Sequence, residues 1–412
     1  MFGLKQISPW QFAVFRILLA AYLIIHFAQL IPYAGELFSA AGALGDPMLS
    51  PLFKILPSPF WLSDTPAMAT GLLALGVLAS IAFLLGWRRK LAALVLLYIW
   101  ASLFCRNPLI ANPSLAYVGL MLLLSTFIPN AEALRSGKGK EEKWFYPAGA
   151  YWTAWLLLAI GYTFSGLIKL QSPSWLNGTA LIHLVENPLA RPGVLRDLLL
   201  SLPDGALYMM TWVSLAGEIL FLPLSIWKRG RLFVWTLMLG MHLGIILVVD
   251  FADLTAAMVL IHLFVFDPDW LPARAKGRRR ILFYDGECGL CTNTVKFFLD
   301  EDRERLMEFA PLQGGTASDL LPEEFRDASN LSTVVYLTQE GDQMALKMRS
   351  SAVASALIDI GGFWRLIGWG LVLVPKFIRE PGYRFVAKHR LKFFPGGACR
   401  LPTQEEAKRL LD

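Results

Sequence analysis

The fold of the C-terminal third is indicated by the stretch Ile281-Leu282-Phe283-Tyr284-Asp285-Gly286-Glu287-Cys288-Gly289-Leu290-Cys291-Thr292. An apolar run typical of a buried strand leads into a Cys-x-x-Cys motif and then a helix, which is the arrangement of a thioredoxin-like redox site. The first cysteine would stand just before the helix, where the helix dipole and unpaired N–H groups favour a thiolate. We therefore predict that Cys288 is the nucleophile and that Cys291, one turn further on, resolves the mixed disulfide.

The pattern that follows the motif predicts a small α/β domain over residues 281–412. Period-2 and period-3.6 segments alternate along it, separated by turn residues. The predicted elements are a strand at Arg280–Tyr284, a helix at Thr292–Asp302, a strand at Leu306–Ala310, a helix at Ala317–Phe325, a hairpin of Ser332–Leu337 with Ala345–Met348, and a helix at Ser351–Ile360. This order predicts a thioredoxin-like domain. The next apolar segment, Phe363–Ile378, is interpreted as an amphipathic segment or as a ninth membrane span.

The residues before the motif have the composition of a membrane protein. The 412 residues are 55% hydrophobic and 17% charged, and residues 1–270 hold nearly all of the long uncharged runs. We predict a polytopic α-helical membrane domain of about eight helices over residues 1–270, then a basic linker over 271–280. A large water-soluble helical core is disfavoured because many runs lack a polar face. The predicted spans are Phe12–Ile31, Ala67–Leu85, Leu91–Phe104, Leu115–Ile128, Ala148–Leu170, Leu207–Ile226, Leu232–Val249 and Leu254–Phe266.

The positive charges predict the topology. The formal net charge is +6, but the basic residues cluster between apolar runs, so we expect no nucleic-acid partner. With eight spans, every basic cluster falls on the side of the N-terminus, which the positive-inside rule makes cytoplasmic. No cleavable signal peptide is evident. We predict a multi-pass protein of the inner (plasma) membrane whose N-terminus and C-terminal domain are both cytoplasmic, so that the cysteine pair rests as a dithiol.

Ionisable residues within the predicted spans are candidates for a second site, because a charge inside a membrane usually faces a cavity or a partner. Lys169, Glu218 and His242 are the residues that we favour, ahead of His26 and His262. A buried lysine can have its pKa lowered enough to act as a base. The alternative for Lys169 is a side chain that extends to the membrane–water interface. The alternative for Arg16 is an anchor at the end of a helix.

A metal site is the main alternative for the cysteine pair. A zinc site would need two further ligands, for which His389 and Cys399 are available. Their spacing does not match the usual ligand pattern, so we predict no metal. Cys399 by itself is interpreted as a buried small residue.

The C-terminal residues resemble the DCC family of thiol–disulfide oxidoreductase-like proteins over roughly residues 280–403. The resemblance is carried by Tyr284–Cys291, Arg349–Ala352, Tyr383–Arg390 and Cys399–Pro402. It implies a thiol–disulfide oxidoreductase with Cys288 and Cys291 as the redox pair. The strand near Ser332–Leu337 lacks the proline that thioredoxins place against their active site, which implies a different docking of the substrate.

The N-terminal residues resemble the HTTM domain, the membrane module related to vitamin K-dependent γ-carboxylase, over roughly residues 7–271. The resemblance is carried by Phe15–Leu18, Tyr162–Trp175 with Gly178, His242 and Phe264–Trp270. It implies that Lys169 matches a lysine that acts as a base in hydroquinone-driven chemistry. The segment Ala111–Leu115 lacks a histidine of that family and the large lumenal domain is missing, so γ-glutamyl carboxylation is not expected.

Taken together, these residues predict an integral membrane thiol–disulfide oxidoreductase with an unidentified protein thiol or disulfide as its partner. A membrane cavity near Lys169, Glu218 and His242 would bind a quinone or a lipid. The alternatives are a membrane-anchored binding or scaffold protein and a transporter, neither of which has redox turnover.

Overall fold

The computed structural model describes residues 7–134, 144–250, 252–273, 277–285, 289–326, 334–393 and 404–412. The chain divides into two compact units, residues 1–266 and residues 267–412. The first is mostly helical and contains several apolar helices, and the second is a small domain built on a mixed sheet, as the sequence predicts.

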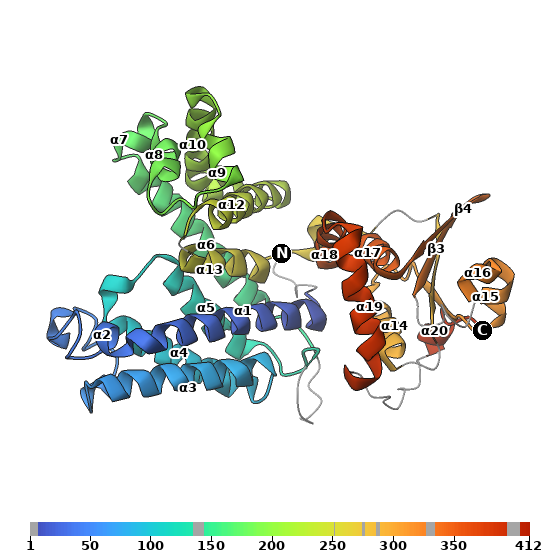
Figure 1. Ribbon diagram of the computed structural model, residues 1–412, viewed down its shortest axis with the longest axis horizontal. Helices are drawn as coiled ribbons and strands as arrows, with labels where there is room; N and C mark the ends of the chain where they lie inside the picture. Colours follow the sequence, from blue (N-terminus) through green and yellow to red (C-terminus); the bar gives the residue numbers. More distant parts are fainter. Residues whose placement is uncertain are drawn as a thin grey trace. The chain divides into compact units, whose positions relative to one another are not determined.

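Among the described residues of the first unit there are eight helices of 13 residues or more, one at each apolar run singled out in the sequence, and Figure 1 shows how they are arranged. They are α1 (Pro9–Leu30), α3 (Pro66–Leu84), α4 (Arg89–Arg106), α5 (Ser114–Phe127), α6 (Ala148–Lys169), α10 (Asp204–Ile219), α12 (Lys228–Val248) and α13 (Ala252–Phe264). The shorter elements are η1 (Ile31–Tyr33), α2 (Ala34–Phe38), η2 (Pro47–Leu49), η3 (Pro59–Trp61), η4 (Pro108–Ile110), α7 (Pro173–Leu176), α8 (Ala180–Glu186), α9 (Val194–Leu200) and α11 (Phe221–Leu224).

Local sequence sets the starts of the first two long helices. Ser8 and Thr65 accept hydrogen bonds from backbone N–H groups in the first turns of α1 and α3, and a proline follows each of them at a position that needs no donor. Helix α1 then packs against α3 and α13, and α5 lies between α4 and α13. In Figure 1, α1 and α3 run side by side.

A buried arginine joins two of these helices. The guanidinium of Arg89 is 2.9 Å from the Glu132 carboxylate and donates to the carbonyls of Ser125, Ile128 and Pro129. Carbonyls at the end of a helix lack partners within the helix, so Arg89 satisfies those at the end of α5. Arg89 is 1% exposed. It belongs to a basic cluster between two of the predicted apolar runs, and its side chain is part of the helix packing.

Helix length corrects the prediction of eight membrane spans. Among the described residues, four segments are long and apolar enough to cross a bilayer, Pro9–Phe38, Pro66–Leu84, Ala148–Lys169 and Lys228–Val248, and α9 with α10 makes a fifth if that bent pair is one span. Helices α5 and α13 have 14 and 13 residues. At about 1.5 Å per residue they reach about 20 Å, short of a hydrocarbon core of about 30 Å. The predicted span Leu207–Ile226 is broken, because α10 ends at Ile219 and α11 follows.

The second unit contains a four-stranded sheet in the order β2-β1-β3-β4. Strand β1 is parallel to β2 and antiparallel to β3, and β3 and β4 form a hairpin that turns at Gly341-Asp342. The strands are β1 (Arg279–Tyr284), β2 (Glu308–Pro311), β3 (Val335–Glu340) and β4 (Gln343–Met348). The other elements are η5 (Pro268–Trp270), α14 (Gly289–Glu301), α15 (Gly315–Leu320), α16 (Glu323–Arg326), α17 (Arg349–Ile360), α18 (Gly362–Leu373), α19 (Lys376–Phe393) and α20 (Gln404–Ala407).

The two faces of this sheet are covered by different elements. Ile281, Phe283 and Val335 alternate onto one face and form a core with Ala317 of α15. Tyr336 alternates onto the opposite face, where its hydroxyl donates to Asp359 of α17, 2.9 Å away. The predicted strand and hairpin are confirmed, with bounds shifted by a few residues.

The apolar segment Phe363–Ile378 is divided between two helices. Helix α18 has 12 residues, or about 18 Å, which is too short for the alternative of a ninth span. Phe363 and Trp364 are buried, and the indole N–H of Trp364 donates to Glu301, so α18 packs within the second unit. Leu373 and Phe377 are exposed, which gives the segment a second, apolar surface.

Candidate functional site

The Cys-x-x-Cys motif follows strand β1 in the sequence, and its last three residues belong to α14. Strand β1 ends at Tyr284 and helix α14 begins at Gly289. Cys288 lies outside the described residues. Cys291 falls in the first turn of α14, and its side chain also lies outside what the structure describes. The structure therefore defines the elements that flank the motif, a buried strand followed by a helix of 13 residues.

Two further segments of the DCC resemblance meet near that helix. Helix α19 contacts both α14 and α17. At the first turn of α17, Ser350 donates to Glu380, and Arg379 donates to the hydroxyl of Ser351 at 3.1 Å. The hydroxyl of Tyr383 accepts the backbone N–H of Val334 just before β3, at 3.1 Å. Segments that are far apart in the sequence are thus hydrogen-bonded into one support beside α14.

A buried polar cluster holds α17 on the sheet. Arg280 is 1% exposed, and its Nε lies 3.5 Å from the Asp359 carboxylate that also accepts the Tyr336 hydroxyl. Burial, together with the charge and hydrogen bond of Asp359, raises the pKa of Tyr336 well above its usual value. Tyr336 is therefore a permanent donor, and the cluster acts as a fixed structural contact rather than as a titrating group.

Lys169 and Glu218, two of the three residues predicted in the first unit, form an ion pair. The Lys169 ammonium lies 2.5 Å from one Glu218 oxygen and 4.3 Å from the centre of the Trp175 ring. The Glu218 side chain is 3% exposed and that of Lys169 is 25% exposed. The second Glu218 oxygen has no hydrogen-bond partner within the described part of the chain. The pair therefore keeps one free, buried acceptor.

His242, the third predicted residue, belongs to a different contact. Its Nε2 is 2.7 Å from the Tyr162 hydroxyl, which is also 3.5 Å from Nε2 of His262. Nδ1 of His262 binds the carbonyl of Met258. His242 is 6% exposed, and its Nδ1 has no hydrogen-bond partner among the described residues. Tyr162 is the first residue of the segment that resembles the HTTM domain but was not predicted as a site residue, because a tyrosine within an apolar helix gives no distinguishing signal.

One face of α6 connects the two contacts. Tyr162, Gly166 and Lys169 are spaced four and three residues apart and so lie on the same face. A Cβ at Gly166 would be 2.8 Å from the backbone nitrogen of Ile219, so only glycine permits this approach of α6 to the end of α10. Thr163, the residue after Tyr162, donates to the carbonyls of Glu218 and Ile219. The glycine thereby allows Glu218 to reach Lys169.

The structure describes some of the residues that were considered as metal ligands and one of the remaining cysteines. Among the described residues no three His, Cys, Asp or Glu side chains are grouped to hold a metal ion. Of the zinc alternative, His389 is a partly buried residue of α19 whose Nδ1 binds the Phe385 carbonyl, and Cys399 lies outside the described residues. Cys105 is a buried free thiol at the end of α4.

Comparison with known proteins identifies the second unit. Residues 282–395 match the family model of the DCC1-like thiol-disulfide oxidoreductase. The uncharacterized protein YuxK of Bacillus subtilis is 33% identical over 133 residues, which are 32% of this chain and 93% of that protein. A chloroplastic DCC family protein of Arabidopsis thaliana is 30% identical over 130 residues, which are 31% of this chain and 73% of that protein. No solved structure matches the chain.

The mixed-sheet unit, with its strand and helix on either side of a Cys-x-x-Cys motif, is thus a domain of the thiol–disulfide oxidoreductase class. Through this domain the chain belongs to the DCC family.

Proposed function

We propose that this protein is an integral membrane thiol–disulfide oxidoreductase whose redox pair is Cys288 and Cys291. The observation that carries the proposal is the match to the DCC1-like family over 282–395, which includes both cysteines. The Cys288 thiolate attacks a partner disulfide, which forms a mixed disulfide and releases one partner thiolate. Cys291 then attacks the sulfur of Cys288, so that the partner leaves as a dithiol and the pair becomes a disulfide.

A thioredoxin-like domain is part of this proposal. Its support is the strand order β2-β1-β3-β4 with β1 and β2 parallel, together with a helix directly after β1. In such an arrangement the first cysteine lies at a helix N-terminus, where the dipole stabilises the thiolate.

The first unit is proposed to be an HTTM-like membrane domain. Four helices are long and apolar enough to span a bilayer. Large apolar side chains are exposed on them, including Ile25 on α1, Leu78 on α3 and Phe233 on α12. A soluble protein rarely exposes so many, so lipid is the environment that explains them. As part of the proposal, the N-terminus and the redox domain face the cytoplasm of a cell with an inner (plasma) membrane, since an even number of spans, such as the four long helices, keeps both on one side and basic residues favour the cytoplasmic side.

The membrane ligand is proposed to be a quinone or a lipid, held near Lys169, Glu218 and His242. The free Glu218 oxygen and the free Nδ1 of His242, both on described residues, are buried groups able to bind a polar head. Oxidation of a hydroquinone to the quinone would release two electrons and two protons, the number that returns the Cys288–Cys291 disulfide to the dithiol after the pair has reduced a partner. The alternative is a scaffold or a transporter, which the buried charges also permit.

Trapping of mixed disulfides in intact cells tests the redox role. With Cys291→Ser, the attack by Cys288 cannot be resolved, so a covalent adduct with the partner protein should accumulate and should disappear on reduction. The matched control is Cys288→Ser, which should give no adduct. If neither variant traps a protein and Cys288→Ser keeps its function in cells, thiol exchange is not the role and the scaffold or transporter remains. Lys169→Ala tests the membrane site, where full function at normal expression would count against it.

A further inference from the structure

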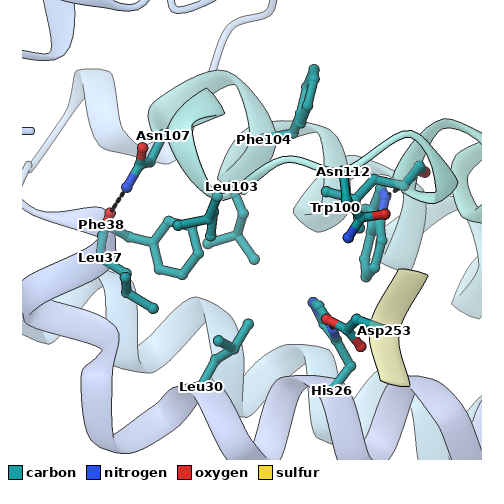
Figure 2. Close-up of a pocket in the computed structure, with 12 residues that line it drawn as sticks. His26, Leu30, Leu37, Phe38, Trp100, Leu103, Phe104, Asn107, Asn112 and Asp253 are labelled. Carbon is teal, nitrogen blue, oxygen red and sulfur yellow. Dashed lines mark hydrogen bonds and ion pairs between the residues drawn. The ribbon is translucent and has the colours of Figure 1, made fainter. Parts of the chain in front are cut away.

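A cavity of about 130 Å³ lies at one end of the helix bundle of the first unit. It is placed where α1 and α4 end and where α5 and α13 begin. Figure 2 shows apolar side chains on its walls, with Leu30, Phe38 and Leu103 facing one another across it. We call it the His26 cavity, after the histidine that lines it. Neither the redox pair nor the residues near Lys169 belong to it.

The polar wall of the His26 cavity is a histidine–aspartate pair. Nδ1 of His26 lies 2.9 Å from a carboxylate oxygen of Asp253, which comes from the first turn of α13. The His26 ring packs against the Trp100 ring at 4.7 Å between centres. Figure 2 places His26 and Asp253 together at one side of the cavity. Among the described residues, Nε2 of His26 makes no hydrogen bond.

This geometry sets the hydrogen-bonding character of the histidine. A carboxylate accepts only, so Nδ1 must donate to Asp253. In neutral His26 the proton is then on Nδ1, and Nε2 presents a lone pair. The Asp253 side chain is 25% exposed and that of His26 is 11% exposed, so the pair opens onto space rather than being sealed in the core. The His26 cavity therefore offers an oriented acceptor on His26, with Asp253, Asn107 and Asn112 as further polar lining residues among mostly apolar walls.

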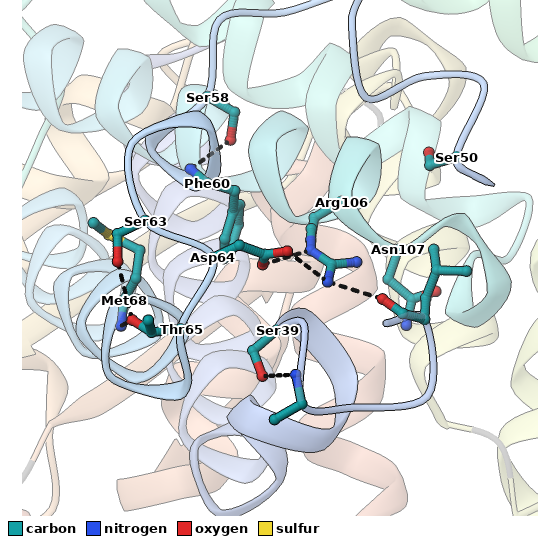
Figure 3. Close-up of polar contacts among 12 residues, drawn as sticks. Ser39, Ser50, Ser58, Phe60, Ser63, Asp64, Thr65, Met68, Arg106 and Asn107 are labelled. Atoms are coloured by element: carbon teal, nitrogen blue, oxygen red, sulfur yellow. Dashed lines mark hydrogen bonds and ion pairs between the residues drawn. The ribbon is translucent and has the colours of Figure 1, made fainter. Parts of the chain in front are cut away.

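The wall of the cavity is held in place before any ligand arrives. Figure 3 shows Arg106 at the end of α4 bound to Asp64 through two nitrogens, at 2.9 and 3.0 Å. The adjacent Asn107 lines the cavity and donates to the carbonyl of Leu37 at 2.7 Å. Ser50 donates to the Cys105 carbonyl at 2.7 Å. The loop between α2 and α3 is thus fixed to the end of α4, and a preformed site loses little entropy on binding.

We propose that the His26 cavity binds an uncharged molecule with a single six-membered ring that carries a hydroxyl group, and that the hydroxyl donates to Nε2 of His26. An apolar protein cavity of about 150 Å³ is known to hold benzene, so the volume suits one ring. The mostly apolar walls favour an uncharged ring, and the acceptor on His26 favours a ligand that donates a hydrogen bond. The site is separate from the proposed thiol exchange and does not depend on it.

Binding of 4-propylphenol to the full-length protein in detergent tests the proposal, with propylbenzene as the matched probe that lacks the hydroxyl. Neither molecule reacts with thiols, so the state of the cysteines does not affect the result. Dissociation constants are measured by ligand-observed NMR. We expect the wild type to prefer the phenol by about fivefold, the contribution of one hydrogen bond.

Three variants make the test specific. His26→Phe keeps an aromatic ring but removes the acceptor, so both probes should bind equally and propylbenzene should bind as to the wild type. Leu103→Trp fills the cavity, and only detergent background should remain. The matched control is Leu62→Trp, at a position 88% exposed and away from the cavity, which should bind as the wild type does. Equal binding by Leu103→Trp and the wild type, or a preference for the phenol retained by His26→Phe, would overturn the proposal.

Discussion

Gly166 provides the sharpest test of how the first unit is packed. In Gly166→Ala the added methyl group would lie 2.8 Å from both the backbone nitrogen and Cγ1 of Ile219 and 3.0 Å from Cβ of Glu218. A backbone atom cannot move aside as the end of a flexible side chain can. We therefore expect α6 and the end of α10 to separate, which would lengthen the contact between Lys169 and Glu218.

The expected magnitude comes from two opposing effects. Overpacking of a filled interface costs about 1–3 kcal/mol. Replacing glycine by alanine within a helix returns about 0.5–1 kcal/mol. The net loss in the free energy of unfolding therefore lies between about 0 and 2.5 kcal/mol, with a midpoint near 1 kcal/mol, which corresponds to a lowering of Tm by about 2–4 °C for a unit of this size.

Gly240→Ala supplies the matched control for this prediction. Gly240 lies in α12 with open space where a Cβ would stand, so the same substitution should leave Tm unchanged or raise it. The assay is thermal unfolding of the full-length protein in one detergent, followed by tryptophan fluorescence. If Gly166→Ala were as stable as Gly240→Ala, the close approach of α6 and α10 would be wrong, and with it the account of why Lys169 meets Glu218.

Three further predictions concern buried contacts. Lys169→Met should lower Tm, because removing one partner of a buried ion pair costs about 3–5 kcal/mol. The double variant Lys169→Met with Glu218→Gln should recover most of that loss. If Tm does not recover, the two side chains are not coupled. Burial raises the pKa of Asp302 despite opposing backbone N–H groups and Arg409. Folding then favours the protonated form, so this contribution is complete below the unfolded value of about 3.9 and is lost as pH rises through the raised pKa. The wild type should thus lose stability relative to Asp302→Asn over that rise, and parallel Tm curves against pH would contradict the shift. Leu411 packs on the core beside β2, so Leu411→Ala should cost about 2 kcal/mol in chemical unfolding of the C-terminal unit, whereas Leu373→Ala, at an 83% exposed position, should cost little.

The sequence was sufficient for the order of elements but not for the number of long helices. Apolar periodicity marks a helix wherever it occurs, and each of the eight runs does form one. It does not mark where a helix must stop. Thr163 accepts the N–H of Leu222 and donates to two carbonyls at the end of α10, which interrupts a run that reads as continuous. Such a stop depends on a residue of another helix, and a single sequence does not pair them.

The same reason explains which of the candidate residues contact one another. Lys169 and Glu218 have opposite charges inside apolar runs, so each needs a partner and pairing them is the simplest solution. His242 has no such constraint, because a neutral imidazole is satisfied by any hydroxyl or carbonyl, and the structure gives it Tyr162. Asp253 was missed because it sits at the first turn of a helix, where a carboxylate is also expected as a favourable partner of the dipole.

Some of the polar side chains inside the first unit share a helix. Tyr162 and Lys169 share one face of α6, while His262 and Asp253 are both on α13. Helix α13 contacts α1, α5, α6 and α12. A displacement of α13 would therefore change the His26–Asp253 contact and the Tyr162–His262 contact together, because both depend on the same rigid helix.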